Sequence, residues 1–166
     1  MASNGCLEIK LLSLLILALT LPTALAYVET TVDVVVEGMV YCQTCEAYGS
    51  WSLKDAKPIG GATVGVVCLD HKSRVKYYKA FDTNSDGYFY GQLEGFTMDH
   101  YLLDHPLHSC KLRLVSSPLD NCNILSNVNN GLNGSPLRYE NKVVRGEKYE
   151  AVIYSAGPLA FRPETC

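Results

Sequence analysis

Short runs rich in β-branched and aromatic residues alternate with turn residues along most of the chain. Such runs are typical of β-strands, and no apolar period of about 3.6 residues indicates an amphipathic helix. The pattern predicts a small all-β domain, a barrel or sandwich of six or seven antiparallel strands. The clear strands are expected over residues 32–41, 62–69, 75–81, 88–90, 111–115 and 149–154.

Alternation within these runs predicts which side chains point inward, because successive residues of a strand face opposite sides. Val64, Val66 and Cys68 share one face, which places Cys68 inside the domain. Tyr88 and Tyr90 share a face opposite to that of Phe89. Residues 121–136 are rich in Asn and Gly and are expected to form a long loop or a broken irregular segment.

The first 26 residues have the three parts of a secretory signal: Lys10, a predominantly apolar run over residues 11–21, and small residues up to Ala26. The apolar run is about half of the roughly 20 residues that a membrane span needs. We therefore expect cleavage after Ala26, no membrane anchor, and a secreted single domain over residues 27–166.

Six cysteines remain after the signal, and the seventh, Cys6, leaves with it. An even set in an oxidising compartment predicts three disulfides, although spacing alone leaves 15 connectivities open. The pair Cys42 and Cys45 also has the spacing of a redox dithiol or of half a zinc site. No helix is expected after Cys45 and no second closely spaced pair follows, so two structural half-cystines are favoured. The six are Cys42, Cys45, Cys68, Cys110, Cys122 and Cys166.

Basic residues gather in one segment of an otherwise acidic chain. The formal net charge is -3, which is too mild to indicate a nucleic-acid partner. Residues 54–79 hold six Lys or Arg residues and two Asp residues, a net charge of +4. This segment would attract a polyanion, with Lys72, Arg74 and Lys76 as the candidate contacts; a merely solvated strand surface is the alternative.

Three stretches resemble the pollen Ole e 1 allergen and extensin-like family of plants, and especially its seed and root hair protective proteins and proline-rich cell-wall proteins. They are residues 36–45 with the C-x-x-C pair, residues 61–68, and residues 110–118 followed by Cys122. The resemblance runs from Val32 to Cys166 and implies a small β-barrel or sandwich. It also implies the disulfides Cys42–Cys122, Cys45–Cys166 and Cys68–Cys110. The proline-rich or histidine-rich stalk of many wall relatives is missing from this sequence.

Other candidate chemistry is weaker. Residues 82–87 match the first half of a calcium loop, but Leu93 stands where the bidentate Glu belongs, and a hairpin turn explains the same residues. His100, His105 and His108 fit no metal template, and a solvated loop is favoured. The sequence carries no recognisable catalytic motif, so a non-enzymatic protein without cofactor or metal is expected.

The leading hypothesis is a secreted cell-wall protein that binds or organises wall polysaccharide in cells such as root hairs, seed coat or pollen. Pectin, galactan or arabinogalactan are the expected partners, and other wall proteins are further candidate partners. Tyr48 and Trp51 are candidate stacking residues, because aromatic faces pack on sugar rings. Asn133 begins an N-glycosylation sequon. The alternative is a protein-interaction or signalling module that displays the loops 100–108 and 121–136.

Overall fold

The computed structural model describes residues 31–96, 105–146 and 149–166. The expected signal segment, its cleavage site and His100 lie outside these residues. The short helical elements are η1 (Cys45–Ala47), α2 (Pro106–Ser109) and η2 (Val128–Asn130). The strands are β1 (Thr31–Cys42), β2 (Lys57–Pro58), β3 (Thr63–Leu69), β4 (Val75–Asp82), β5 (Tyr88–Gln92), β6 (Cys110–Ser116), β7 (Ile124–Leu125), β8 (Ser135–Pro136), β9 (Arg138–Arg145) and β10 (Tyr149–Arg162).

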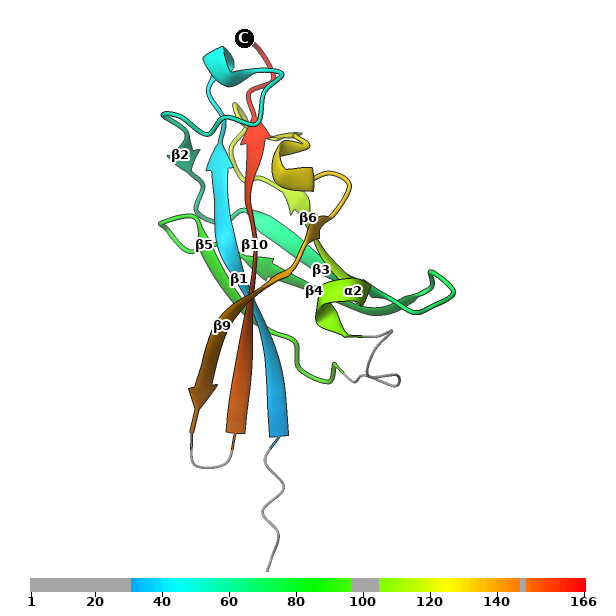
Figure 1. The fold of residues 1–166 in the computed structure, drawn as a ribbon. Helices are drawn as coiled ribbons and strands as arrows, with labels where there is room; N and C mark the ends of the chain where they lie inside the picture. The colour runs from blue at the N-terminus through cyan, green and yellow to red at the C-terminus, as the bar shows by residue number, and fades with distance from the viewer. Residues whose placement is uncertain (1–30, 97–104, 147–148) are drawn as a thin grey trace, which may run out of the picture.

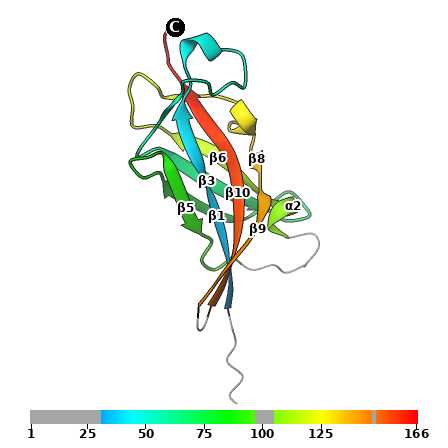
Figure 2. The same cartoon turned by 60° about the vertical axis from the view of Figure 1, so that its left-hand side comes forward.

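Two sheets form a sandwich (Figures 1 and 2). In the six-stranded sheet, called sheet A, β1 and β10 lie side by side in the middle. Strands β2 and β5 pair with the free edge of β1, while β7 and β9 pair with that of β10. Sheet B has four antiparallel strands in the order β4-β3-β6-β8.

The core lies between the two sheets and is built from the inward residues of each strand. Val36 of β1, Phe161 of β10 and Phe89 of β5 meet Val66 of β3 and Leu112 of β6, all at most 1% exposed. The predicted inward position of Cys68 and the opposite facing of Phe89 and its two tyrosine neighbours agree with this packing.

The all-β sandwich is confirmed, but its expected uniformly antiparallel pairing is wrong for one pair. Strands β1 and β10 run parallel, in register from Thr31–Tyr149 to Cys42–Phe161. Both strands are covered on two sides, since Val35, Ala151 and Ile153 form a second buried cluster on the outer side of sheet A. Strands buried on both faces are typical of parallel pairing. Neither sheet closes on itself, so the barrel alternative does not hold.

The structure adds local detail in two places. The polar strand β9 escaped the sequence analysis because its exposed residues do not alternate with apolar ones. Residues 121–136, expected to be a long loop or a broken irregular segment, contain only the short elements β7, η2 and β8.

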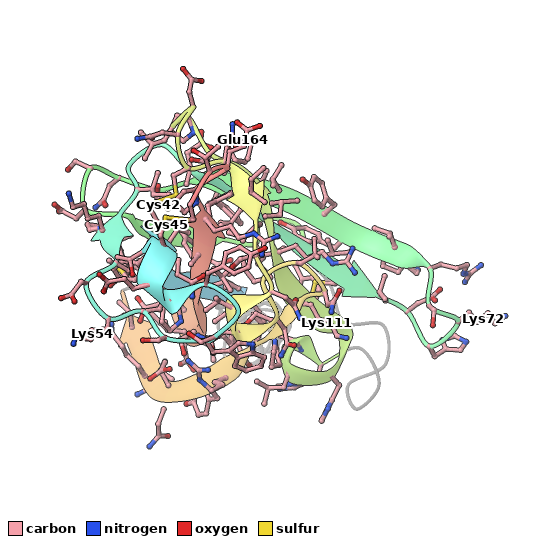
Figure 3. All side chains as sticks on the ribbon, turned by 90° about the horizontal axis from the view of Figure 1, so that it is seen from above. Cys42, Cys45, Lys54, Lys72, Lys111 and Glu164 are labelled. Atoms are coloured by element: carbon pink, nitrogen blue, oxygen red, sulfur yellow. A yellow bond between two sulfur atoms is a disulfide. The ribbon has the colours of Figure 1, made fainter. Side chains whose placement is uncertain are left out.

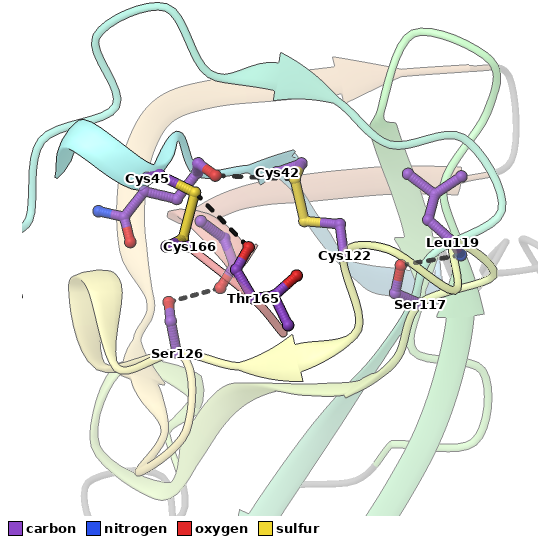
Figure 4. The surroundings of a disulfide bond; sticks show 10 residues. Cys42, Cys45, Ser117, Leu119, Cys122, Ser126, Thr165 and Cys166 are labelled. Carbon is purple, nitrogen blue, oxygen red and sulfur yellow. Dashed lines mark hydrogen bonds between the residues drawn. A yellow bond between two sulfur atoms is a disulfide. The ribbon is translucent and has the colours of Figure 1, made fainter. Parts of the chain in front are cut away.

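The structure forms three disulfides, and they are the pairs that the family resemblance implies. Cys42 is joined to Cys122, Cys45 to Cys166 and Cys68 to Cys110. The first two lie together where β1 and β10 end, and the third joins β3 to β6 (Figure 4). In the chain-entropy model, closing loops of this length contributes about 4–5 kcal/mol each.

The turn between β3 and β4 is organised by one buried carboxylate, that of Asp70. Its Oδ1 accepts the N–H groups of Lys72 and Arg74 at 2.8 and 2.9 Å. Its Oδ2 accepts hydrogen bonds from Nε and Nη2 of Arg74 at 2.8 and 2.7 Å. These hydrogen bonds, that from the Arg74 backbone N–H foremost, lower the pKa of Asp70 to about 2 against the opposing effect of burial. The hairpin is therefore held in shape by an ionised Asp70.

Gly38 of β1 and Gly65 of β3 both lie within strands, and we expect alanine to be tolerated at one of them alone. A Cβ at Gly38 would overlap the backbone oxygen of Ala156, whereas at Gly65 it would meet only the movable ring of Tyr78. Gly38→Ala should therefore cost about 1–3 kcal/mol of unfolding free energy. Gly65→Ala, the matched control, should stay within about 0.5 kcal/mol. Equal effects in urea unfolding would contradict this packing.

Acid should weaken the β3–β4 hairpin through Asp70. Because its folded pKa lies below the ordinary value of 3.8, its stabilising contribution is complete above pH 3.8 and is lost as the pH falls through about 2. Thermal unfolding between pH 5 and pH 2 should therefore show a steeper loss for the native chain than for Asp70→Asn. Asp86→Asn, in the exposed turn before β5, should keep the native pH dependence; parallel curves for all three proteins would refute this role of Asp70.

Candidate functional site

The predicted binding residues fall into two groups that lie far apart. Lys72, Arg74 and Lys76 lie on the β3–β4 hairpin, whereas Tyr48 and Trp51 belong to the loop that follows β1 and η1. Figure 3 shows Lys72 at the tip of the hairpin, well away from Cys45 and from Lys54. The basic segment 54–79 therefore does not form one continuous surface, and each group is a separate candidate site.

Sheet register adds two cations to the hairpin group. On β3, Val67 lies opposite Tyr78 of β4 on one side and Lys111 of β6 on the other. Gly65 likewise pairs with Arg113. Since the neighbours Val66, Leu112 and Leu114 point into the core, Tyr78, Lys111 and Arg113 point outward from sheet B. We call this surface the basic face; it comprises Lys72, Arg74, Lys76, Tyr78, Lys111 and Arg113.

The ring of Tyr78 provides an aromatic platform within the basic face. It lies over Gly65, where an added Cβ would be 2.9 Å from its Cε2 and 3.1 Å from its hydroxyl oxygen. Because Gly65 has no Cβ, the Tyr78 ring can pack directly against the sheet. Tyr78 is nevertheless 55% exposed. An exposed ring lying against a sheet can stack on a flat ligand.

The charges of the basic face are unequally available. Arg74 pairs with Asp70, and Lys79, on the other side of β4, pairs with Glu94 at 3.1 Å. Lys111 and Arg113 have no carboxylate partner among the described residues, although Arg113 donates to the carbonyl of Asn133 at 3.1 Å. Residues two apart on a strand are about 7 Å apart, which is within the Debye length of about 8 Å at physiological salt. Their fields therefore add toward an approaching anion.

The sequon residue Asn133 borders this face. It is exposed, and its neighbour Gly134 lies against Lys111, since an added Cβ would come within 2.9 Å of the lysine Cδ. Glycosylation of Asn133 remains a prediction. A glycan on this residue would project beside Lys111 and Arg113.

The second group surrounds a small cavity at the end of the molecule that carries the C-terminus. Trp51 is 59% exposed and Tyr48 61%. The guanidinium of Arg162, from the end of β10, stacks on the Tyr48 ring at 4.9 Å. A cavity of about 190 Å³ opens between Trp51, Gln43, Arg162 and residues 126–128.

The outer side of sheet A carries a shallow groove that sequence reasoning missed. Tyr88 donates its hydroxyl hydrogen to Glu37 at 2.6 Å, and burial together with this carboxylate raises the pKa of Tyr88. Arg138 and Glu140 of β9 line the same groove, where Glu140 bonds to Ser155. Its mixed charges give a polyanion no reason to prefer it to the basic face. The one sign of this groove in the local sequence was the alternation of Tyr88 and Tyr90 with Phe89.

His105 and the half calcium loop have structural roles. His105 begins α2, where its Nδ1 accepts the N–H of Leu107 at 3.3 Å, and its ring packs edge-on against Tyr154. In the turn after β4, the Asn84 side-chain oxygen accepts the N–H groups of Asp86 and Tyr88, as in a hairpin turn. Within residues 31–96, 105–146 and 149–166, no three His, Cys, Asp or Glu side chains are grouped to hold a metal ion.

Of the two loops named in the interaction-module hypothesis, residues 121–136 are hydrogen-bonded to the sandwich. Ser126 donates to the carbonyl of Ala160 at 2.6 Å, and Asn129 donates to that of Pro158 at 2.7 Å. Most of the other loop, residues 100–104, lies outside the described residues. In the part of the chain that the structure describes, no helix has the length and apolarity to cross a membrane.

Plant extracellular proteins are similar to this chain. It is 33% identical over 139 residues to non-classical arabinogalactan protein 30 of Arabidopsis thaliana, covering 80% of the chain and 54% of that protein. It is 34% identical over 135 residues to the pistil-specific extensin-like protein of Nicotiana tabacum, covering 76% of the chain and 30% of that protein. The chain thus spans about half of the first relative and less than a third of the second.

A solved structure gives the same fold. The crystal structure of the major plantain pollen allergen Pla l 1 superposes with a TM-score of 0.54 at 25% identity, over 80% of this chain and 95% of the allergen. A scan against models of known protein families finds no match. The sequence relatives and the shared sandwich nevertheless agree with the motifs around the six cysteines: the chain belongs to the pollen Ole e 1 allergen and extensin-like family.

Proposed function

We propose that this protein is a secreted, non-enzymatic component of the plant cell wall that binds acidic wall polysaccharide through the basic face. The observation that carries the proposal is the grouping of Lys111 and Arg113 with the exposed ring of Tyr78 on the outer side of sheet B. A pectic chain offers a carboxylate on each acidic sugar and a flat apolar face on each ring. The basic face offers complements to both.

The shape of the surface supports an extended ligand. The outer side of a sheet is nearly flat, and the cations lie on three elements, the hairpin turn, β4 and β6, so that no enclosed pocket limits the length of a bound polymer. Binding of this kind is dominated by charge attraction and should weaken as salt screens it. Galactan and arabinogalactan are candidate ligands of other surfaces, such as the groove beside Glu37 and Tyr88.

The relatives support the setting. Their names describe arabinogalactan, extensin-like and pollen allergen proteins. Three disulfides suit an extracellular domain that must persist without cellular reducing systems. We infer a role in wall integrity, in specialised cells such as pollen, root hairs or seed coat.

Charge reversal on β6 should abolish most pectin binding. In Lys111→Glu/Arg113→Glu, the face gains two carboxylates where the ligand presents its own, and affinity for polygalacturonate at low salt should fall at least about tenfold, or about 1.4 kcal/mol. Lys72→Glu and Lys76→Glu should add to the loss. Affinity measured by biolayer interferometry should also fall as NaCl is raised from about 20 to 200 mM.

The control carries the same charge change on another surface. Lys54→Glu/Lys57→Glu alters the basic segment of the sequence, but Lys54 and Lys57 lie in the loop before β2 and in β2 itself, away from the basic face. It should bind polygalacturonate almost as the native chain does. If both double variants lose affinity equally, net charge and not the basic face governs binding.

Disulfide mapping tests the extracellular assignment. Mass spectrometry of peptides from the secreted, unreduced protein should find the disulfides Cys42–Cys122, Cys45–Cys166 and Cys68–Cys110. The most N-terminal peptide of the mature chain should begin at Tyr27. A Cys42–Cys45 bridge or a free thiol in the mature protein would contradict the fold described above.

A further inference from the structure

The cavity beside Trp51 has features of a binding site that are separate from the basic face. It lies where β1 and β10 end and is bounded by the loop 49–51, residues 126–128 and two side chains, Gln43 and Arg162. Figure 4 shows the two disulfides of this end, Cys42–Cys122 and Cys45–Cys166, close together near Ser126. The walls are therefore cross-linked to one another.

Gln43 supplies a buried polar atom that has no partner among the described residues. The residue is only 3% exposed, yet it lines the cavity. Its Nε2 donates to the carbonyls of Ala47, Ser50 and Ser52 at 3.0–3.1 Å, which fixes the orientation of the amide. Its Oε1 accepts no hydrogen bond from any described residue. A buried acceptor left unpaired in this way is costly, and a ligand hydroxyl would satisfy it.

Arg162 supplies a cation whose donors are available. The Tyr48 ring covers one face of its guanidinium at 4.9 Å, and no carboxylate of the described residues pairs with it. Stacking leaves the N–H groups at the edge of the guanidinium free to bind oxygens. A carboxylate is the group that this edge binds best, because its two oxygens match two parallel N–H donors.

Trp51 supplies an apolar wall, and the volume limits the ligand. The cavity of about 190 Å³ is smaller than the 300–1,000 Å³ of sites for drug-sized ligands. The space suits a single sugar ring better than several consecutive rings. One large aromatic face, one acceptor and one cation are the groups needed to bind such a ring.

We propose that this cavity binds one terminal sugar ring that bears a carboxylate, a uronic acid at the end of a glycan chain. The apolar face of the ring stacks on Trp51, its carboxylate pairs with Arg162, and one of its hydroxyls donates to Oε1 of Gln43. The basic face would bind the body of an acidic chain, whereas this site reads a chain end. The two sites share no residue and can fail independently.

The position of the tryptophan makes the test direct, because Trp51 is the one Trp of the chain. Its fluorescence, followed in the full mature protein, should change saturably with galacturonic or glucuronic acid. Galactose and glucose, which lack the carboxylate, should bind at least about tenfold more weakly. Arg162→Gln should remove this preference, and Trp51→Ala, followed by ligand-observed NMR, should lose binding.

Three controls separate the outcomes. Tyr90→Ala removes an equally exposed aromatic side chain on the outer side of sheet A and should leave uronate binding unchanged. Lys111→Glu/Arg113→Glu should also leave it unchanged, even where polygalacturonate binding is lost. Trp51→Phe should retain binding, which guards against a folding defect in Trp51→Ala. No saturable response to any uronic acid, equal affinity for the neutral sugars, or full binding by Trp51→Ala would overturn the proposal.

Discussion

The parallel pairing of β1 with β10 is the constraint on which the rest of the structure depends. It joins the first and last strands of the described chain along the whole length of β1. Every other strand of sheet A attaches to a free edge of this pair. Because parallel strands end on the same side, the C-x-x-C pair at the end of β1 meets the tail that follows β10. The Cys45–Cys166 bridge and the cavity beside Trp51 both follow from this one pairing.

The local sequence pattern predicted the inward faces of strands and the positions of turns, because neighbouring residues alone determine these features. The alternation in β3 predicted the inward positions of Val64, Val66 and Cys68 correctly, because one face of this strand packs on the core. The turn after Asp70 and that at Asn84 were recognisable from residues that hydrogen-bond to their own backbone. The parallel partner of β1 could not be predicted, since more than 100 residues separate the two strands. Neither strand's sequence indicates whether its partner runs parallel or antiparallel to it.

The candidate sites divide in the same way. Lys72, Arg74 and Lys76 are close in sequence and were found from charge alone, but Lys111 and Arg113 join them only through the register of β3 with β6. Tyr48 and Trp51 were found as exposed aromatics, whereas the roles of Gln43 and Arg162 depend on burial and on a stacking contact between residues 114 positions apart. Sequence showed the types of side chain available; the pairing of strands determined which of them act together.

Rigidity distinguishes the two surfaces physically. The basic face presents long, solvated cations on a flat sheet, so its attraction is long-ranged, tolerant of ligand register and sensitive to salt. The cavity holds the Gln43 amide, which three carbonyls fix and which lies between the half-cystines Cys42 and Cys45, so its groups are already in place before a ligand arrives. Preorganisation reduces the entropy lost on binding and favours discrimination between similar ligands. A small disulfide-linked sandwich can thus combine weak capture of a polymer with selective recognition of its end, because the cross-links lie beside the site that needs fixed geometry.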